Sequence, residues 1–115
     1  MKKPLVVRIV RSEWARGKTA MYDTGSSLLL RSGKKCCLGF ACLALGATEE
    51  NIYLKGTPRG IDVGVAIPTW LRMSGATTDV WRLIITNDSP RTSDAVKERR
   101  ITRIFARHNL KAVFK

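Results

Sequence analysis

The chain has no long apolar run and few acidic residues. No stretch approaches the length of about 18 apolar residues that a membrane-spanning helix needs. The apolar run at residues 5–10 is interrupted by Arg8, and it is too short for a signal peptide. We therefore expect neither a membrane span nor a secretory leader.

Cysteine and histidine are also scarce: the chain has three cysteines and one histidine. Cys36 and Cys37 are neighbours that cannot easily form a disulfide with each other, and an odd number leaves one thiol over. Disulfides are rare in reducing compartments. We therefore predict a reduced, cytoplasmic protein.

Common nucleotide-binding and hydrolase motifs are absent, including GxGxxG, HExxH and GxSxG. Residues 17–19, Gly-Lys-Thr, match only the end of a phosphate-binding loop and lack the strand and glycines that should precede it. The sequence therefore predicts no cofactor, no bound metal and no small-molecule substrate.

A zinc site was weighed against this prediction. Cys36, Cys37, Cys42 and His108 supply the donor atoms of a Cys₃His site. Adjacent cysteines and an i, i+5 spacing do not form the CxxC knuckle that such sites normally use. Burial of the cysteines as small apolar side chains is the favoured interpretation.

Cysteine-based catalysis is the other chemical hypothesis. Cys36 or Cys37, at a helix N-terminus behind two lysines, would have a lowered thiol pKa. His108, with Asn87 or Asp88, could complete a Cys–His–Asn/Asp arrangement. His108 shares a helix face with apolar residues, however, where a packed histidine is the commoner finding. We therefore predict a protein that is not an enzyme.

Residues 36–46, CCLGFACLALG, lie in the longest run without a charged residue or a strong hydrogen-bonding side chain. Leu38, Ala41, Cys42 and Leu45 repeat at helical spacing, and the opposite side is apolar too, which predicts a helix buried all round. Within this segment a glycine, Gly39, would let another backbone approach closely. The glycine at position 46 suits the left-handed conformation at the helix end.

The remaining pattern predicts an α+β fold for residues 1–115 as one domain. Residues 5–10 and 110–114 read as strands that pair in one small sheet. Ser12 is expected to cap a short turn, Thr48 a second turn, and Thr92 or Ser93 a long surface helix that ends near residue 108. The segment beginning at residues 77–79 fits a helix or a strand, and residues 61–65 fit a short strand within a long loop.

Positive charge is concentrated at the two ends of the chain, which has 21 Lys and Arg against nine Asp and Glu. Residues 1–35 carry a net +7 and residues 91–115 a net +6, whereas residues 36–90 carry −1. Such a distribution is typical of proteins with an anionic partner, nucleic acid being the commonest. A solvated surface that keeps the protein soluble is the alternative.

The predicted last helix separates its residue types by face. Ile101, Ile104, Phe105 and His108 fall within one arc of about 100°, and the arginines fall within a second arc turned roughly 120° away. Guanidinium groups bind phosphate through paired donors. We expect a binding surface that includes Arg99, Arg100, Arg103 and Arg107, helped by Lys2, Lys3 and Lys111 if the terminal strands lie beside the helix.

Four short segments follow one another along the chain: Ser-Glu-Trp at 12–14, Leu-Leu-Leu-Arg-Ser-Gly-Lys at 28–34, Cys-Cys-Leu-Gly-Phe at 36–40 and Asn-Asp at 87–88. Together these segments resemble a family of short uncharacterised proteins of tailed phages and prophages. The resemblance implies a cytoplasmic accessory protein of the infected host cell and supplies no catalytic residue.

We therefore expect a non-enzymatic accessory protein that binds nucleic acid or nucleoprotein through a basic surface. The alternative is an anti-CRISPR-like inhibitor that blocks a host defence complex, or another host protein complex, by protein contact.

Overall fold

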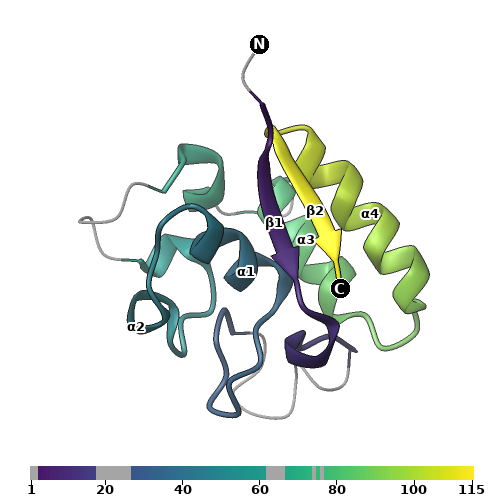
Figure 1. Ribbon diagram of the computed structural model, residues 1–115, viewed down its shortest axis with the longest axis horizontal. Helices are drawn as coiled ribbons and strands as arrows, with labels where there is room; N and C mark the ends of the chain where they lie inside the picture. The colour runs from purple at the N-terminus through teal and green to yellow at the C-terminus, as the bar shows by residue number, and fades with distance from the viewer. Residues whose placement is uncertain (1–2, 18–26, 62–66, 74, 76) are drawn as a thin grey trace.

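A two-stranded sheet joins the two ends of the chain. Strand β1 (Leu5–Ile9) lies parallel to strand β2 (Leu110–Phe114), with Leu5 opposite Leu110 and Ile9 opposite Phe114 (Figure 1). The helices occupy the connection between these parallel strands, which confirms the predicted α+β fold and the pairing of the terminal strands. The computed structural model describes residues 3–17, 27–61, 67–73, 75 and 77–115.

One face of the sheet is buried against the core. Val7 and Ile9 alternate along β1 and are completely buried, and Leu110 begins β2 in the same core. The ring of Phe114 packs against that of Trp14, with 5.2 Å between the ring centroids. Helix α1 (Cys37–Ala44) contacts β1, so the sheet covers one side of this helix.

Helix α1 is the buried centre of the fold, as predicted. Cys36 occupies the N-cap position, and all residues from 37 to 42 are buried. Gly46 has a φ of 106°, which confirms its predicted left-handed conformation at the helix end. A Cβ atom added to Gly39 would lie 2.0 Å from the carbonyl oxygen of Leu28. Only glycine fits at this position, because the backbone around Leu28 lies directly against the helix.

The buried side chain of Asn87 connects three segments of the chain. Its Oδ1 accepts hydrogen bonds from the indole Nε1–H of Trp14 at 2.8 Å and from the backbone N–H of Cys37 at 3.0 Å. Its Nδ2 donates to the Ala15 carbonyl and to Asp88 Oδ1, both at 2.9 Å. All four hydrogen-bonding positions of the amide are thus used. Residues 14–15, 37 and 87–88 therefore meet at this network.

Two helices fill the C-terminal half and pack against each other: α3 (Asp79–Asp88) and α4 (Asp94–Ala106). Thr78 and Ser93 cap them by accepting hydrogen bonds from backbone N–H groups of the first turns. The segment that fitted both a helix and a strand is therefore a helix. Asn109, with a φ of 59°, makes the left-handed turn between α4 and β2.

The short elements agree with the sequence in part. Thr48 caps helix α2 (Glu49–Ile52) through a reciprocal pair of hydrogen bonds with Asn51. The predicted cap at Ser12 is wrong, because the 3₁₀ turn spans Arg11–Glu13 and Ser12 lies inside it without capping. Two further 3₁₀ turns span Pro58–Gly60 and Thr69–Arg72. The strand expected at 61–65 falls almost entirely outside the described residues.

Candidate anion-binding groove

The four arginines expected to form a strip lie on the outer side of α4. The helix is held against the core by Ile101, Ile104 and Phe105, which are all buried. Because these residues occupy the inner arc of the helix, the arginines on the other arc face solvent. The exposed residues are Arg99, Arg100, Arg103 and Arg107.

A groove with a volume of about 320 Å³ lies between α3 and α4. Its apolar and neutral lining comes from Ile85, Thr86 and Ile104. Planar guanidinium groups can each bind a phosphate or a carboxylate through two parallel hydrogen bonds. Four of them line this space, which we call the arginine groove: Arg82, Arg100, Arg103 and Arg107.

Arg82 is the groove residue that the sequence did not reveal. It lies on α3, next to the buried Leu83, and its side chain is half exposed. Helical periodicity could have placed Arg82 on an outer face once the segment was read as a helix. Its position opposite the arginines of α4 follows only from the packing of the two helices.

Asp79 forms ion pairs with two of the groove arginines. Its carboxylate lies 2.8 Å from Arg82 Nη1, 3.2 Å from Arg107 Nη1 and 2.7 Å from His108 Nε2. Partial burial alone would raise the pKa of Asp79, but hydrogen bonds from His108 and Arg82 and the charge of Arg107 lower it overall. The His108 ring also stacks on Trp70, with centroids 3.7 Å apart.

Arg100 and Arg103 carry positive charge that the fold does not neutralise. Within the described part of the chain, neither forms an ion pair, and the ion pairs of the other two groove arginines go to Asp79. The groove therefore has three more arginines than carboxylates. Like charges held together on a concave surface raise the local positive potential, which attracts anions.

Arg99 points toward the other side of α4. It lines a second hollow together with Glu98, Thr102 and Phe114, and Arg103 borders both this hollow and the groove. The four arginines that appeared as one strip on the helical projection therefore face two different spaces.

Two of the lysines expected to assist, Lys3 and Lys111, do not line the groove. Lys111 is exposed on β2, which packs beside α4 as the prediction required. Lys3 is exposed just before β1, and its carbonyl accepts a hydrogen bond from Asn109 Nδ2. Lys2 lies outside the described residues.

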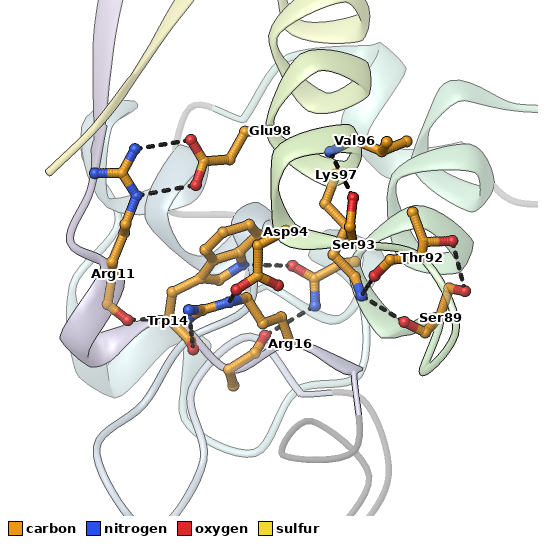
Figure 2. A network of polar contacts seen from close by, with 12 residues as sticks. Arg11, Trp14, Arg16, Ser89, Thr92, Ser93, Asp94, Val96, Lys97 and Glu98 are labelled. Carbon is orange, nitrogen blue, oxygen red and sulfur yellow. Dashed lines mark hydrogen bonds and ion pairs between the residues drawn. The ribbon is translucent and has the colours of Figure 1, made fainter.

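Three other basic residues, Arg11, Arg16 and Lys97, make contacts within the protein (Figure 2). Arg11 binds Glu98 through two hydrogen bonds of 2.9 and 2.8 Å, and Arg16 lies 3.0 Å from Asp94. The ammonium group of the buried Lys97 donates to the carbonyls of Ser89 and Thr92 in the turn between α3 and α4. These contacts tie the N-terminal segment and the turn to α4.

The cysteines do not have the environment of reactive thiols. All three are buried, and burial raises the pKa of Cys36 and of Cys42 to about 12 and that of Cys37 well above its ordinary value. The predicted lowering of the thiol pKa is therefore wrong. Backbone N–H groups at the start of α1 do favour the thiolate of Cys36, but the loss of hydration outweighs them.

The proposed cysteine, histidine and asparagine group is not assembled. Asn87 binds the backbone of Cys37 and the indole of Trp14, whereas His108 binds Asp79. The four residues of the Cys₃His hypothesis do not come together either. Across the described residues, no cluster of three or more His, Cys, Asp or Glu side chains is arranged to hold a metal ion.

The chain matches no protein-family model, no curated protein and no solved structure. Among the described residues, none of the helices combines the length and apolar character required to cross a membrane.

Proposed function

We propose that the protein is a non-enzymatic nucleic-acid-binding protein whose arginine groove contacts the phosphate backbone. The observation that carries this proposal is the grouping of four guanidiniums on α3 and α4 with one neighbouring carboxylate. Phosphates of the nucleic acid would supply the negative charge that the groove arginines lack. The cations condensed on the nucleic acid would be released at the same time, which favours binding.

The scaffold supports the same proposal. Helix α4 carries most of the groove arginines, and it is fixed by its buried apolar residues and by the ion pairs that Arg11 and Arg16 make with Glu98 and Asp94. Guanidiniums on a fixed helix lose less freedom on binding than those on a loop, so more of the interaction energy is kept as affinity. The resemblance to phage proteins adds a setting to this proposal, in which the protein acts in the cytoplasm of an infected cell.

A protein partner is the second candidate, as part of a nucleoprotein or of a host defence complex. It is favoured by apolar side chains that remain exposed near the groove, namely Met73, Trp81 and Ile85. An acidic protein surface with apolar neighbours would match this combination. Such contacts should depend less steeply on salt than a series of phosphate contacts.

A salt titration with two charge-matched variants tests the proposal. One variant carries Arg100→Ala and Arg103→Ala, which remove groove charges that make no ion pair within the described residues. The control carries Arg8→Ala and Lys115→Ala, which remove two exposed charges that do not line the groove. Binding of each protein to labelled single-stranded DNA, duplex DNA and RNA is measured by fluorescence anisotropy at several salt concentrations.

We expect the groove variant to bind more weakly and the control to bind nearly like the original protein. A plot of log K against log salt should become less steep by about 1.4 for single strands, because each lost phosphate contact reduces the magnitude of its negative slope by about 0.7. Equal losses in both variants would show that net charge rather than the groove controls binding. Absence of binding to every nucleic acid at about 0.15 M salt would overturn the proposal and direct attention to protein partners.

A single substitution locates the surface more finely. Arg99→Ala changes the hollow beside Phe114 and leaves the arginine groove intact. If the groove alone binds, this variant should retain the affinity of the original protein. A loss comparable to that of the double variant would place the contact on the other side of α4.

A further inference from the structure

Helix α3 exposes apolar side chains beside the arginine groove. Trp81 and Ile85 are 44% and 52% exposed, and Met73 is 53% exposed. In a helix, positions four apart lie about 40° apart around the axis and one turn along it, so Trp81 and Ile85 form a single ridge. Exposed apolar residues that cluster in this way commonly mark a binding surface.

This ridge separates the arginine groove from an apolar pocket. Ile85 lines the groove, whereas Trp81 lines a pocket of about 420 Å³ together with Met73, Val80 and Ile84. The pocket volume falls within the range of roughly 300–1,000 Å³ that is usual for ligand sites. An apolar pocket and a cationic groove are therefore adjacent on one helix.

The indole of Trp81 differs from the other two tryptophans. Trp14 is buried and packs on Phe114, and Trp70 stacks on His108. Among the described residues, Trp81 packs on no other aromatic ring, and 44% of its surface is exposed. An aromatic side chain next to a cationic groove is the arrangement by which proteins hold single-stranded nucleic acids.

We propose that the pocket beside Trp81 receives a base of a single-stranded nucleic acid whose phosphates lie in the arginine groove. This inference rests on the proposed function and specifies its ligand. A base in a single strand can turn outward and stack on the indole, whereas a base in a duplex is held within the helical stack. The ridge residue Ile85 would lie under the sugar between the stacked base and the bound phosphates.

Charge favours a nucleic acid over an acidic peptide on this surface. The groove has three more arginines than carboxylates, and two of these arginines make no ion pair within the described residues. A nucleic-acid strand carries one phosphate on every nucleotide, so successive arginines can each meet an anion. A peptide would need several closely spaced carboxylates next to an apolar side chain to match the same groove.

The test separates base stacking from phosphate binding. The probes are an oligothymidylate and an abasic oligodeoxynucleotide of equal length, which has the same phosphates and no bases. Anisotropy titrations compare the original protein with Trp81→Ala and Trp81→Phe. Because nearly half of Trp81 is exposed and it lies outside the buried core, neither change should unfold the protein, and circular dichroism of each variant verifies this.

We expect the original protein to prefer oligothymidylate over the abasic strand. Trp81→Ala should weaken oligothymidylate binding by roughly 5- to 150-fold, the range for loss of one stacked base, and should leave abasic binding unchanged. Trp81→Phe should retain part of the preference, because a phenyl ring still offers a stacking face.

Three outcomes would overturn the inference. Equal affinity of the original protein for both strands would remove the role of the base and leave groove binding intact. An equal loss for both strands in Trp81→Ala would show that Trp81 acts on the phosphates or on the fold. Failure to bind either strand, together with Trp81-dependent binding of an acidic leucine-containing peptide, would refute the proposed function as well and favour a protein partner.

Discussion

Replacing Asn87 by aspartate changes one NH₂ group into an oxygen and tests the network at the centre of the fold. In the native protein, Nδ2 donates to the Ala15 carbonyl and to Asp88 Oδ1. An aspartate would turn an oxygen toward these two oxygens, whereas its other oxygen would still accept from Trp14 and Cys37. The substituted side chain is therefore expected to take up a proton in the folded state, because the site is buried.

The cost of that proton sets the magnitude. Holding a carboxyl group with an unfolded pKa of about 3.9 in its neutral form costs about 1.36 kcal/mol per pH unit, roughly 4 kcal/mol at pH 7 and 1.5 kcal/mol at pH 5. The single O–H of the protonated acid can replace one of the two hydrogen bonds that Nδ2 donates. Loss of the second hydrogen bond adds about 1 kcal/mol to the cost. We therefore expect Asn87→Asp to lower the free energy of unfolding by about 5 kcal/mol at pH 7 and by about 2–3 kcal/mol at pH 5.

Urea unfolding, followed by circular dichroism, measures this difference against the original protein at each pH. Asn51→Asp provides a matched control with the same chemical change. Asn51 uses its Oδ1 in the Thr48 capping box, and a carboxylate near the start of α2 is favourable, so this control should differ by less than about 0.5 kcal/mol. A deficit for Asn87→Asp below about 1 kcal/mol at pH 7, or one that does not shrink at pH 5, would refute the reasoning.

Three further predictions concern the core, the groove and the thiols. Gly39→Ala should lower stability by about 2 kcal/mol or more in urea unfolding, because overlap with the Leu28 carbonyl outweighs the gain of about 1 kcal/mol in helix propensity; an unchanged urea midpoint would contradict the close backbone contact. Because the pKa of Asp79 is lowered in the folded protein, its ionised carboxylate stabilises the fold at pH values above the ordinary carboxyl pKa of 3.8. This contribution is lost as the pH falls through the lowered pKa. Asp79→Asn should therefore flatten the acid side of a plot of thermal midpoint against pH, and an unaltered plot would count against the ion pairs with Arg82 and Arg107. The three buried cysteines should react slowly with a thiol-specific reagent until the protein unfolds, since burial raises each thiol pKa; rapid labelling of the native protein would contradict their burial.

Local signals were sufficient to predict much of the architecture. The uncharged run at residues 36–46 predicted a buried helix, and the β-branched residues near the N-terminus predicted the first strand. Thr48 was predicted as one cap and Thr92 or Ser93 as another, because a side-chain acceptor before a helix satisfies N–H groups only two or three residues away. The structure has Thr48 and Ser93 in these positions. The pairing of the terminal strands in one small sheet was also predicted and is confirmed.

Predictions that depended on the environment of a side chain failed or stayed incomplete. The N-terminal position of Cys36 and Cys37 suggested a lowered thiol pKa, but their burial, which depends on the whole core, raises it. Asn87 was considered as a partner of His108, yet it contacts residues 50 to 73 positions away in the chain. Desolvation and long-range hydrogen bonds depend on which segments surround a residue, and a single sequence does not specify this.

The candidate site shows the same division between local and tertiary information. The outward position of Arg99, Arg100, Arg103 and Arg107 was predicted from helical periodicity, because each helix residue turns by a fixed angle. The packing of α3 against α4 brought Arg82 to the same groove and left Arg99 on the other side. Charge and helix faces are thus properties of the sequence, whereas the shape of the groove and the place of Trp81 beside it result from how two helices meet.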